Sequence, residues 1–258
     1  MISRSLDRRR GLDADLEQQH TPEGVGNRLS RSPKKSYVRD FVYGAIDGAV
    51  TTFAVVAGAA GASLESRVVV IMGLANLLAD GFSMAVSNFL GTRAQAQQKE
   101  VARQSEMRHI DLYPEGEREE VRQIFAAKGF EGEDLERAVE VITSDRRRWV
   151  ETMLTEELGF SVEDGSAGRS ALATFTAFIA IGSIPLLPFL VNLAFEDAIG
   201  DPFAIAALMT GVAFALVGVL KAAVIGQRVW RGAFETVALG GAAAAVAYVV
   251  GVLLQGIG

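Results

Sequence analysis

Residues 68–92, VVVIMGLANLLADGFSMAVSNFLGT, form an apolar stretch with a single charged side chain, Asp80. A helix that crosses the roughly 30 Å hydrocarbon layer of a membrane needs about 20 mostly apolar residues. The stretch meets that length. It is also rich in Gly, Ala and Ser, the small residues that let membrane helices pack closely. It therefore predicts a membrane-spanning helix.

Four further blocks of the same kind lie on either side of this stretch. They cover residues 41–64, 171–195, 202–226 and 233–258, and the first of them is interrupted only by Asp47. Half of the 258 residues are hydrophobic, and they are gathered into blocks rather than spread at the period of a soluble helix or strand. We expect an all-α integral membrane protein with five transmembrane helices.

Outside the apolar blocks, the chain has two segments of opposite net charge. Residues 1–39 carry a net charge of +4, and residues 93–168 carry a net charge of −7. We expect 1–38 to be a disordered basic tail, 39–92 to hold the first two spans, 93–168 to form an acidic helical domain, and 169–258 to hold the last three spans. The tail is interpreted as a solvated, topology-setting segment, with contact to anionic lipid headgroups as the alternative.

The positions of Lys and Arg predict which side of the membrane each segment occupies, because cytoplasmic loops are enriched in these residues. They occur in the tail, directly after the second block, and between the fourth and fifth blocks. The loop between the third and fourth blocks has acidic residues and neither Lys nor Arg. We expect the N-terminus and residues 93–168 to be cytoplasmic and the C-terminus to lie outside. An acidic domain also argues against a nucleic-acid partner.

Local signals divide the acidic domain into helices. The second block is expected to continue without a break into it, and Pro114 suits the first turn of the next helix. Gly129 fits the end of that helix, a third helix is expected over 133–143, and Ser144 or Asp145 is expected to cap a fourth that ends at Gly159. In the third span, a group of helix-breaking residues predicts an interruption: Gly182, Pro185 and Pro188.

Polar side chains inside the apolar blocks are the first candidates for function. Asp47 lies mid-span, where a carboxylate is costly and is expected to face a cavity or a partner. The second block carries a polar stripe at intervals of four residues: Asn76, Asp80, Met84 and Asn88. A thioether beside carboxylates favours a late first-row metal ion. The alternatives are a hydrogen bond from the Thr51 hydroxyl that satisfies Asp47, and simple packing for Met84.

A second group of candidates lies in the acidic domain. Glu106 and His109 form a Glu-x-x-His pair, Glu117 and Glu120 form a Glu-x-x-Glu pair, and Met153, Glu156 and Glu157 fall within one turn. A spacing of three places two side chains on one helix face, where they can share an ion. The chain has no cysteine, so its possible metal ligands are oxygen, imidazole and thioether. The alternative is a solvated, Glu-rich helix face. The pattern predicts a metal-binding domain.

Several separated segments of the chain resemble the vacuolar iron transporter family. The segments are DGAVTTF (47–53), residues 73–92 with Ser83 and Met84, MLTEELG (153–159), and the Gly-x-x-Pro-Leu-Leu-Pro pattern at 182–188. The similarity runs from about residue 39 to the C-terminus and leaves out the tail. The family resemblance implies five transmembrane helices, a homodimer, and export of Fe²⁺ from the cytoplasm in exchange for protons. It implies the cell membrane for a prokaryotic protein and a vacuolar-type membrane for a eukaryotic one.

The resemblance also implies roles for individual residues. Asp47 and Met84 would form the site within the membrane, where the two copies of the first helix line the path. Glu106, Glu117, Glu120, Met153 and Glu157 would collect metal in the cytoplasmic domain. The sequence departs from the family pattern at three positions: His109 stands where a Glu is expected, Leu154 where some members have Met, and Asn88 where many have an acid. Mn²⁺, Co²⁺ and Zn²⁺ therefore stay open beside Fe²⁺ as substrates.

Two rival interpretations follow from the same residues. A membrane-tethered di-iron oxidase would need a second Glu-x-x-His on a partner helix, and the sequence has none. A membrane-bound metal sensor would leave Asp47, Asp80 and Met84 without a purpose. We expect a transporter and not an enzyme, with a metal ion as substrate and no prosthetic group.

Overall fold

The computed structural model describes residues 18, 20–30, 36–161, 165–195 and 198–255, and the regular structure of these residues is helical. The chain forms two units, residues 1–35 and 36–258. In the first unit, the described residues include one helix, α2 (Pro22–Ser30), within the segment expected to be a disordered tail. The rest of that expectation falls on 1–17, 19 and 31–35, outside the described residues.

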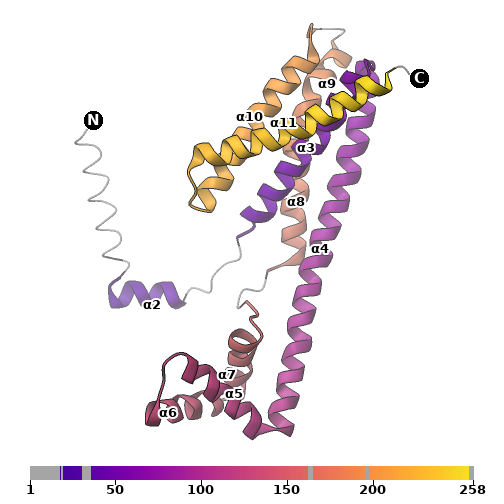
Figure 1. The fold of residues 1–258 in the computed structure, drawn as a ribbon. Coiled ribbons are helices and arrows are strands. Elements are labelled where there is room, and N and C mark those ends of the chain that lie inside the picture. Colours follow the sequence, from indigo (N-terminus) through magenta and orange to yellow (C-terminus); the bar gives the residue numbers. More distant parts are fainter. Residues whose placement is uncertain (1–17, 19, 31–35, 162–164, 196–197, 256–258) are drawn as a thin grey trace, which may run out of the picture. The chain divides into compact units, whose positions relative to one another are not determined.

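The second unit contains five helices that are long and apolar enough to cross a membrane. They are α3 (Val38–Gly61), α4 (Ser66–Leu112), α8 with α9 (Ala167–Ala194), α10 (Pro202–Val224) and α11 (Val229–Leu254), drawn in Figure 1. The prediction of an all-helical protein with five spans is confirmed.

Helix α3 lies at the centre of the membrane helices and packs against α4, α8, α10 and α11. Its contact with α8 depends on Gly44 and Gly48. A Cβ atom added at Gly48 would lie 2.5 Å from the carbonyl oxygen of Phe178, and one at Gly44 would meet the backbone of Thr174. Two helix backbones can approach this closely only where a side chain is missing. These glycines therefore determine how α3 sits against α8.

The third span is interrupted where Gly182, Pro185 and Pro188 predict it. Helix α8 (Ala167–Gly182) ends at the glycine, a 3₁₀ turn, η2, covers Ile184–Leu186, and α9 runs over Leu187–Ala194. Pro185 has no N–H to continue the helical ladder, so the chain tightens into i→i+3 bonds, such as that from the N–H of Leu186 to the carbonyl of Ser183 at 3.0 Å.

Helix α4 is unbroken over 47 residues, as expected (Figure 1). At 1.5 Å per residue it is about 70 Å long, more than twice the thickness of a bilayer core. Val69 and Leu77 near its start belong to the core of the membrane helices. Ile110 near its end belongs to a second core. One rigid helix thus contributes to both.

The second core is formed by the end of α4 with α5 (Pro114–Ala127), α6 (Gly132–Thr143), α7 (Arg146–Thr152) and a π-helical turn, η1 (Met153–Glu157). We call this assembly, residues 93–161, the polar bundle. Its helices begin and end at the predicted signals. Pro114 opens α5, Gly129 follows it with φ +93°, and the Asp145 carboxylate accepts a 2.8 Å hydrogen bond from the N–H of Arg148.

Candidate functional site

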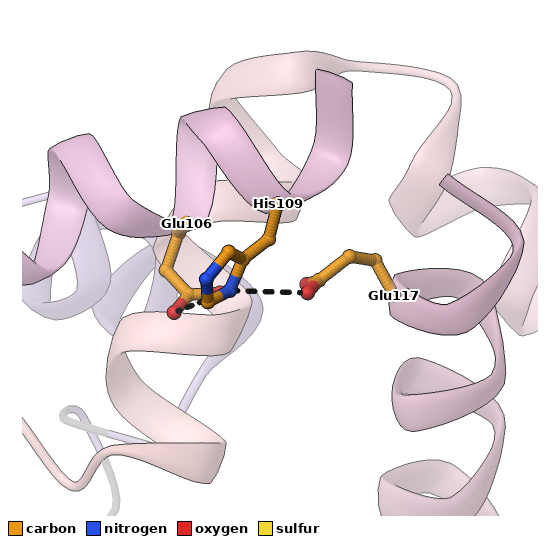
Figure 2. Close-up of side chains that lie close together, drawn as sticks. All are labelled: Glu106, His109 and Glu117. Atoms are coloured by element: carbon orange, nitrogen blue, oxygen red, sulfur yellow. Dashed lines mark ion pairs between the residues drawn. The ribbon is translucent and has the colours of Figure 1, made fainter. Parts of the chain in front are cut away.

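The reversal of the chain between α4 and α5 brings three predicted ligands together. Glu106 and His109 lie in the last two turns of α4, Tyr113 alone separates the two helices, and Pro114 starts α5 immediately. Glu117 is therefore in the first turn of α5 and faces back toward α4. Figure 2 shows the three side chains pointing toward one another from these two helices.

The three side chains form a compact group in the polar bundle. One ligand atom from each of Glu106, His109 and Glu117 lies within 4.8 Å of the others. The imidazole Nδ1 is 3.4 Å from Glu117 Oε1 and 4.0 Å from Glu106 Oε1 (Figure 2). The two glutamates are only 5% and 4% exposed, whereas the His109 side chain is half exposed. The site is thus a buried pair of carboxylates under an imidazole that reaches solvent.

Both glutamates are short of partners. The Oε2 atom of Glu106 and the Oε2 atom of Glu117 are buried and have no hydrogen-bond partner in the described structure. A buried charged oxygen without a partner is costly, so native proteins rarely keep one without a reason. A divalent cation bound by the two carboxylates, or a proton shared between them, would satisfy these oxygens.

The electrostatics of the group follow from this burial. Burial and, to a smaller extent, the negative charges of Glu120, Glu106 and Glu157 together raise the pKa of Glu117 to about 7. Burial also raises the pKa of Glu106, against the lowering influence of His109. Partial desolvation of its carboxyl group and the charges of Glu106 and Glu120 raise the pKa of Glu157 as well. These carboxylates repel one another and favour either a proton or a cation among them.

The remaining predicted ligands divide into neighbours of the group and residues engaged elsewhere. Glu120 and Glu157 are exposed and act on the group through their charges. Met153 is fully buried in the core of the polar bundle. Glu156 forms a 2.6 Å ion pair with Lys128 at the end of α5.

Glu156 and Glu157 are the last two residues of the π-helical turn η1. Within it the N–H of Leu158 bonds the carbonyl of Met153, five residues back, at 3.1 Å. Such a widened turn changes the register of side chains after it, and π-turns are frequent at functional sites. Adjacent glutamates here serve different partners, Lys128 for one and the carboxylate group for the other.

Within the membrane helices, Asp47 on α3 has Asp80 on α4 as its charged neighbour. Asp47 is half-buried, and the Thr51 hydroxyl donates a 2.8 Å hydrogen bond to its backbone carbonyl. The described structure shows no hydrogen bond to the Asp47 carboxylate itself. The alternative in which Thr51 satisfies that carboxylate is therefore not what the structure shows.

Asn88 has a different environment, because it joins three helices. Its amide Nδ2 lies 2.6 Å from Thr174 Oγ1, 3.0 Å from Asp40 Oδ1 and 3.4 Å from the Ser170 carbonyl, and its Oδ1 accepts a hydrogen bond from Thr92. Sequence reasoning missed Asp40. The signal that could have found it is its position seven residues before Asp47, two turns along the same helix.

The other two members of the polar stripe lie on either side of Asp80. Asn76, one turn toward the start of α4, has a buried Nδ2 atom without a hydrogen-bond partner among the described residues. Met84, one turn the other way, packs partly buried against the membrane core. The stripe therefore combines a packed thioether and an unsatisfied amide with the carboxylate of Asp80, whose charged neighbour on α3 is Asp47.

One further residue near the carboxylate group was missed. Ser105 Oγ lies 3.4 Å from His109 Nε2, whereas the glutamates are close to the other ring nitrogen, Nδ1. The signal was its position one turn before His109 on the same helix.

The fold defines a multi-pass membrane protein, with polar side chains inside its spans and a carboxylate–imidazole group at the end of its longest helix. The model of the VIT family matches residues 38–252, and the chain belongs to that family.

Relatives with known names cover most of the chain. The vacuolar iron transporter of Toxoplasma gondii is 32% identical over 257 residues, 97% of this chain and 82% of that protein. That of Plasmodium berghei is 30% identical over 86% of this chain and 83% of that protein. Vacuolar iron transporter 1 of Arabidopsis thaliana is 30% identical over 84% of this chain and 86% of that protein. These are transporters by name, which confirms the resemblance and the expectation that this chain is not an enzyme.

Proposed function

We propose that this protein transports a divalent metal ion across the membrane, with Fe²⁺ as the first candidate because the relatives are named iron transporters. The observation that carries the proposal is the group of Glu106, His109 and Glu117, with two buried carboxylate oxygens that lack partners. Oxygen and imidazole ligands suit Fe²⁺, Co²⁺ and Zn²⁺, and carboxylates also suit Mn²⁺.

The polar bundle acts as the collecting site in this proposal. Its residues, 93–161, carry a net charge of −5, which raises the local concentration of cations. Glu106, His109 and Glu117 would hold the ion, with Glu120 and Glu157 close enough to contribute charge or a ligand. The distribution of Lys and Arg supports placing this bundle and the N-terminus in the cytoplasm and the C-terminus outside.

The second station is the pair of Asp47 and Asp80, with Met84 one turn away. From Asp80 to Glu106 there are 26 residues of unbroken helix, about 40 Å at 1.5 Å per residue. An ion cannot pass directly between sites so far apart. Ions released from the collecting site would therefore reach the membrane entrance through solvent, without direct transfer between the two sets of ligands.

Exposure of α3 supports a homodimer. Asp47 is only half-buried, and Tyr43, one turn before it, is 66% exposed. A carboxylate inside the membrane needs a partner or a water-filled cavity. A second copy of the chain at this face would bring another Asp47 and Met84 to the same path and enclose the ion.

Proton antiport is the coupling that these ligands support. Carboxylates must lose their protons to hold a metal ion, so protons and metal compete for the same oxygen atoms. Release of the ion on the outer side, followed by protonation of the vacated carboxylates there, would return protons to the cytoplasm.

The test compares metal flux into proteoliposomes that contain a metal-sensitive dye. Fe²⁺ is added without oxygen to the wild type, to Asp47→Asn, and to the control Asp134→Asn, which changes an exposed acid on α6. We expect flux and counter-flow of protons in the wild type and the control, and background flux in Asp47→Asn with metal binding to the polar bundle retained. Equal flux in Asp47→Asn and the wild type would overturn the role of Asp47. Binding without flux in the wild type would make the protein a metal sensor.

A further inference from the structure

The imidazole of His109 has different neighbours at its two nitrogens. On one side, Nδ1 faces Oε1 of Glu117 at 3.4 Å and Oε1 of Glu106 at 4.0 Å. On the other side, Nε2 lies 3.4 Å from the hydroxyl of Ser105. Ser105 and His109 are four residues apart on α4, so both project from the same face. Each ring nitrogen thus has its own polar neighbour.

We propose that Ser105 is a positioning residue of the candidate metal site, which fixes Nδ1 of His109 as the ligand nitrogen and so selects ions that accept imidazole, such as Fe²⁺, Co²⁺ and Zn²⁺, over Mn²⁺ and Mg²⁺. This inference rests on the proposed function. The partnerless, almost fully buried Oε2 atoms of Glu106 and Glu117 independently indicate that a ligand completes this site.

A serine hydroxyl suits this position because it can donate or accept a hydrogen bond. Without an ion, the ring proton can reside on Nδ1, which faces Glu117, while the Ser105 hydroxyl donates to Nε2. With an ion on Nδ1, the neutral ring carries its proton on Nε2, and Nε2–H donates to Ser105 Oγ. One proton leaves Nδ1 and one binds Nε2, and the hydroxyl follows by rotation alone.

The consequence for selectivity follows from the exposure of the ring. The His109 side chain is half exposed, so neighbouring atoms restrain it only in part. Partners of the second nitrogen orient metal-binding histidines, and their loss typically lowers metal affinity about 10- to 100-fold. Mn²⁺ and Mg²⁺ are served by carboxylates alone, whereas Co²⁺ and Zn²⁺ gain from imidazole. Loss of Ser105 should therefore weaken binding of Co²⁺ and Zn²⁺ more than binding of Mn²⁺ and Mg²⁺.

The experiment uses the full-length protein in lipid nanodiscs. The chain contains two histidines, so ¹⁵N-labelled histidine gives two pairs of ring signals, one Nδ1 and one Nε2 from each ring, and His20→Gln identifies the pair of His109. Zn²⁺ is added for NMR because it is diamagnetic, and affinities for Co²⁺ and Mn²⁺ are measured by titration calorimetry. The variants are Ser105→Ala, Ser105→Thr, which keeps the hydroxyl, and Gln104→Ala, which removes a neighbouring side chain bonded to Glu100 instead.

In the wild type we expect Zn²⁺ to move the ¹⁵N chemical shift of His109 Nδ1 into the range of a metal-bound nitrogen. The ring proton should then be on Nε2. Ser105→Ala should lower Co²⁺ affinity about 10-fold or more and lower Mn²⁺ affinity far less. In this variant, Zn²⁺ should bind Nδ1 of His109 in some molecules and Nε2 in others. Ser105→Thr and Gln104→Ala should keep the wild-type preference and spectrum.

Unchanged affinity ratios and unchanged Nδ1 ligation in Ser105→Ala would overturn the role of Ser105. If His109 signals do not respond to Zn²⁺ while Glu106→Gln abolishes binding, the inference fails and the collecting site of the proposed function stands. If neither Zn²⁺, Co²⁺ nor Mn²⁺ binds the wild type, the metal-collecting role of the polar bundle fails as well.

Discussion

Lowering the pH from 8 to 6 should weaken metal binding to the polar bundle, and Glu117→Gln should remove part of this dependence. Burial and the nearby carboxylates raise the pKa of Glu117 to about 7, and a carboxylate must be ionised to act as a ligand. About nine-tenths of the Glu117 side chains are then ionised at pH 8 and about one-tenth at pH 6. Competition at this one group should therefore weaken binding about tenfold between these pH values.

The assay is calorimetric titration of the full-length protein with Co²⁺ at several pH values from 5.5 to 8. Glu117→Gln should bind more weakly than the wild type at pH 8. Its affinity should also fall less steeply as the pH decreases from 8 to 6, because about half a proton fewer is released per ion bound, averaged over this range. The matched control is Glu140→Gln, an exposed glutamate of α6, which should keep both the affinity and the slope of the wild type.

The same raised pKa predicts the sign of a stability effect in the ion-free protein. Because the native pKa of Glu117 lies above its ordinary value of 4.5, the native state binds more protons than the unfolded state between these values. Its contribution to stability is complete below about pH 4.5 and is lost as the pH rises through about 7. Glu117→Gln should thus raise the Tm at pH 8 and leave it nearly unchanged at pH 5.

For the metal-binding prediction, identical pH slopes of Co²⁺ affinity in Glu117→Gln and the wild type would refute the reasoning.

Two further predictions concern packing and the boundary of the site. Gly48→Ala places a Cβ against the backbone of Phe178 and should destabilise the protein by about 1–3 kcal/mol; Gly241→Ala, where the added atom meets open space, should be neutral or stabilising in thermal unfolding followed by circular dichroism. Lys128→Ala breaks an ion pair between partly exposed side chains and should change stability by less than about 1 kcal/mol. Lys128→Ala should leave Co²⁺ affinity unchanged. A marked loss of Co²⁺ affinity would instead indicate that Glu156 is a metal ligand.

Much of the architecture was predictable because its causes are local in the chain. A run of about 20 apolar residues must be a helix in a membrane, since the backbone has no other way to satisfy its hydrogen bonds there. The five spans follow from this rule. Helix signals such as Pro114 and Gly129 act within one turn and were equally legible. The spacing of Glu106 and His109 placed both on one face of α4 for the same reason.

The candidate site depended on contacts between elements, which the spacing of residues does not encode. Glu117 comes into reach of His109 only because Tyr113 alone separates α4 from α5. Spacing grouped Glu156 with Glu157, and only the family resemblance singled out Glu157; in the structure Glu156 pairs with Lys128, whereas the charge of Glu157 acts on the carboxylate group. Similarly, the sequence pattern placed Asn88 in the polar stripe. In the structure its side chain on α4 hydrogen-bonds to residues of α3 and α8.

The sequence by itself determined which segments cross the membrane, where the helices of the polar bundle start, and which residue types are available to hold a metal ion. The tertiary structure decided which carboxylates lose water and face one another. Hydrophobic segregation and helix capping act over one or two turns of chain, whereas the burial that raises the pKa of Glu117 is a property of the surrounding helices. Only their packing creates two buried oxygens without partners beside an oriented imidazole.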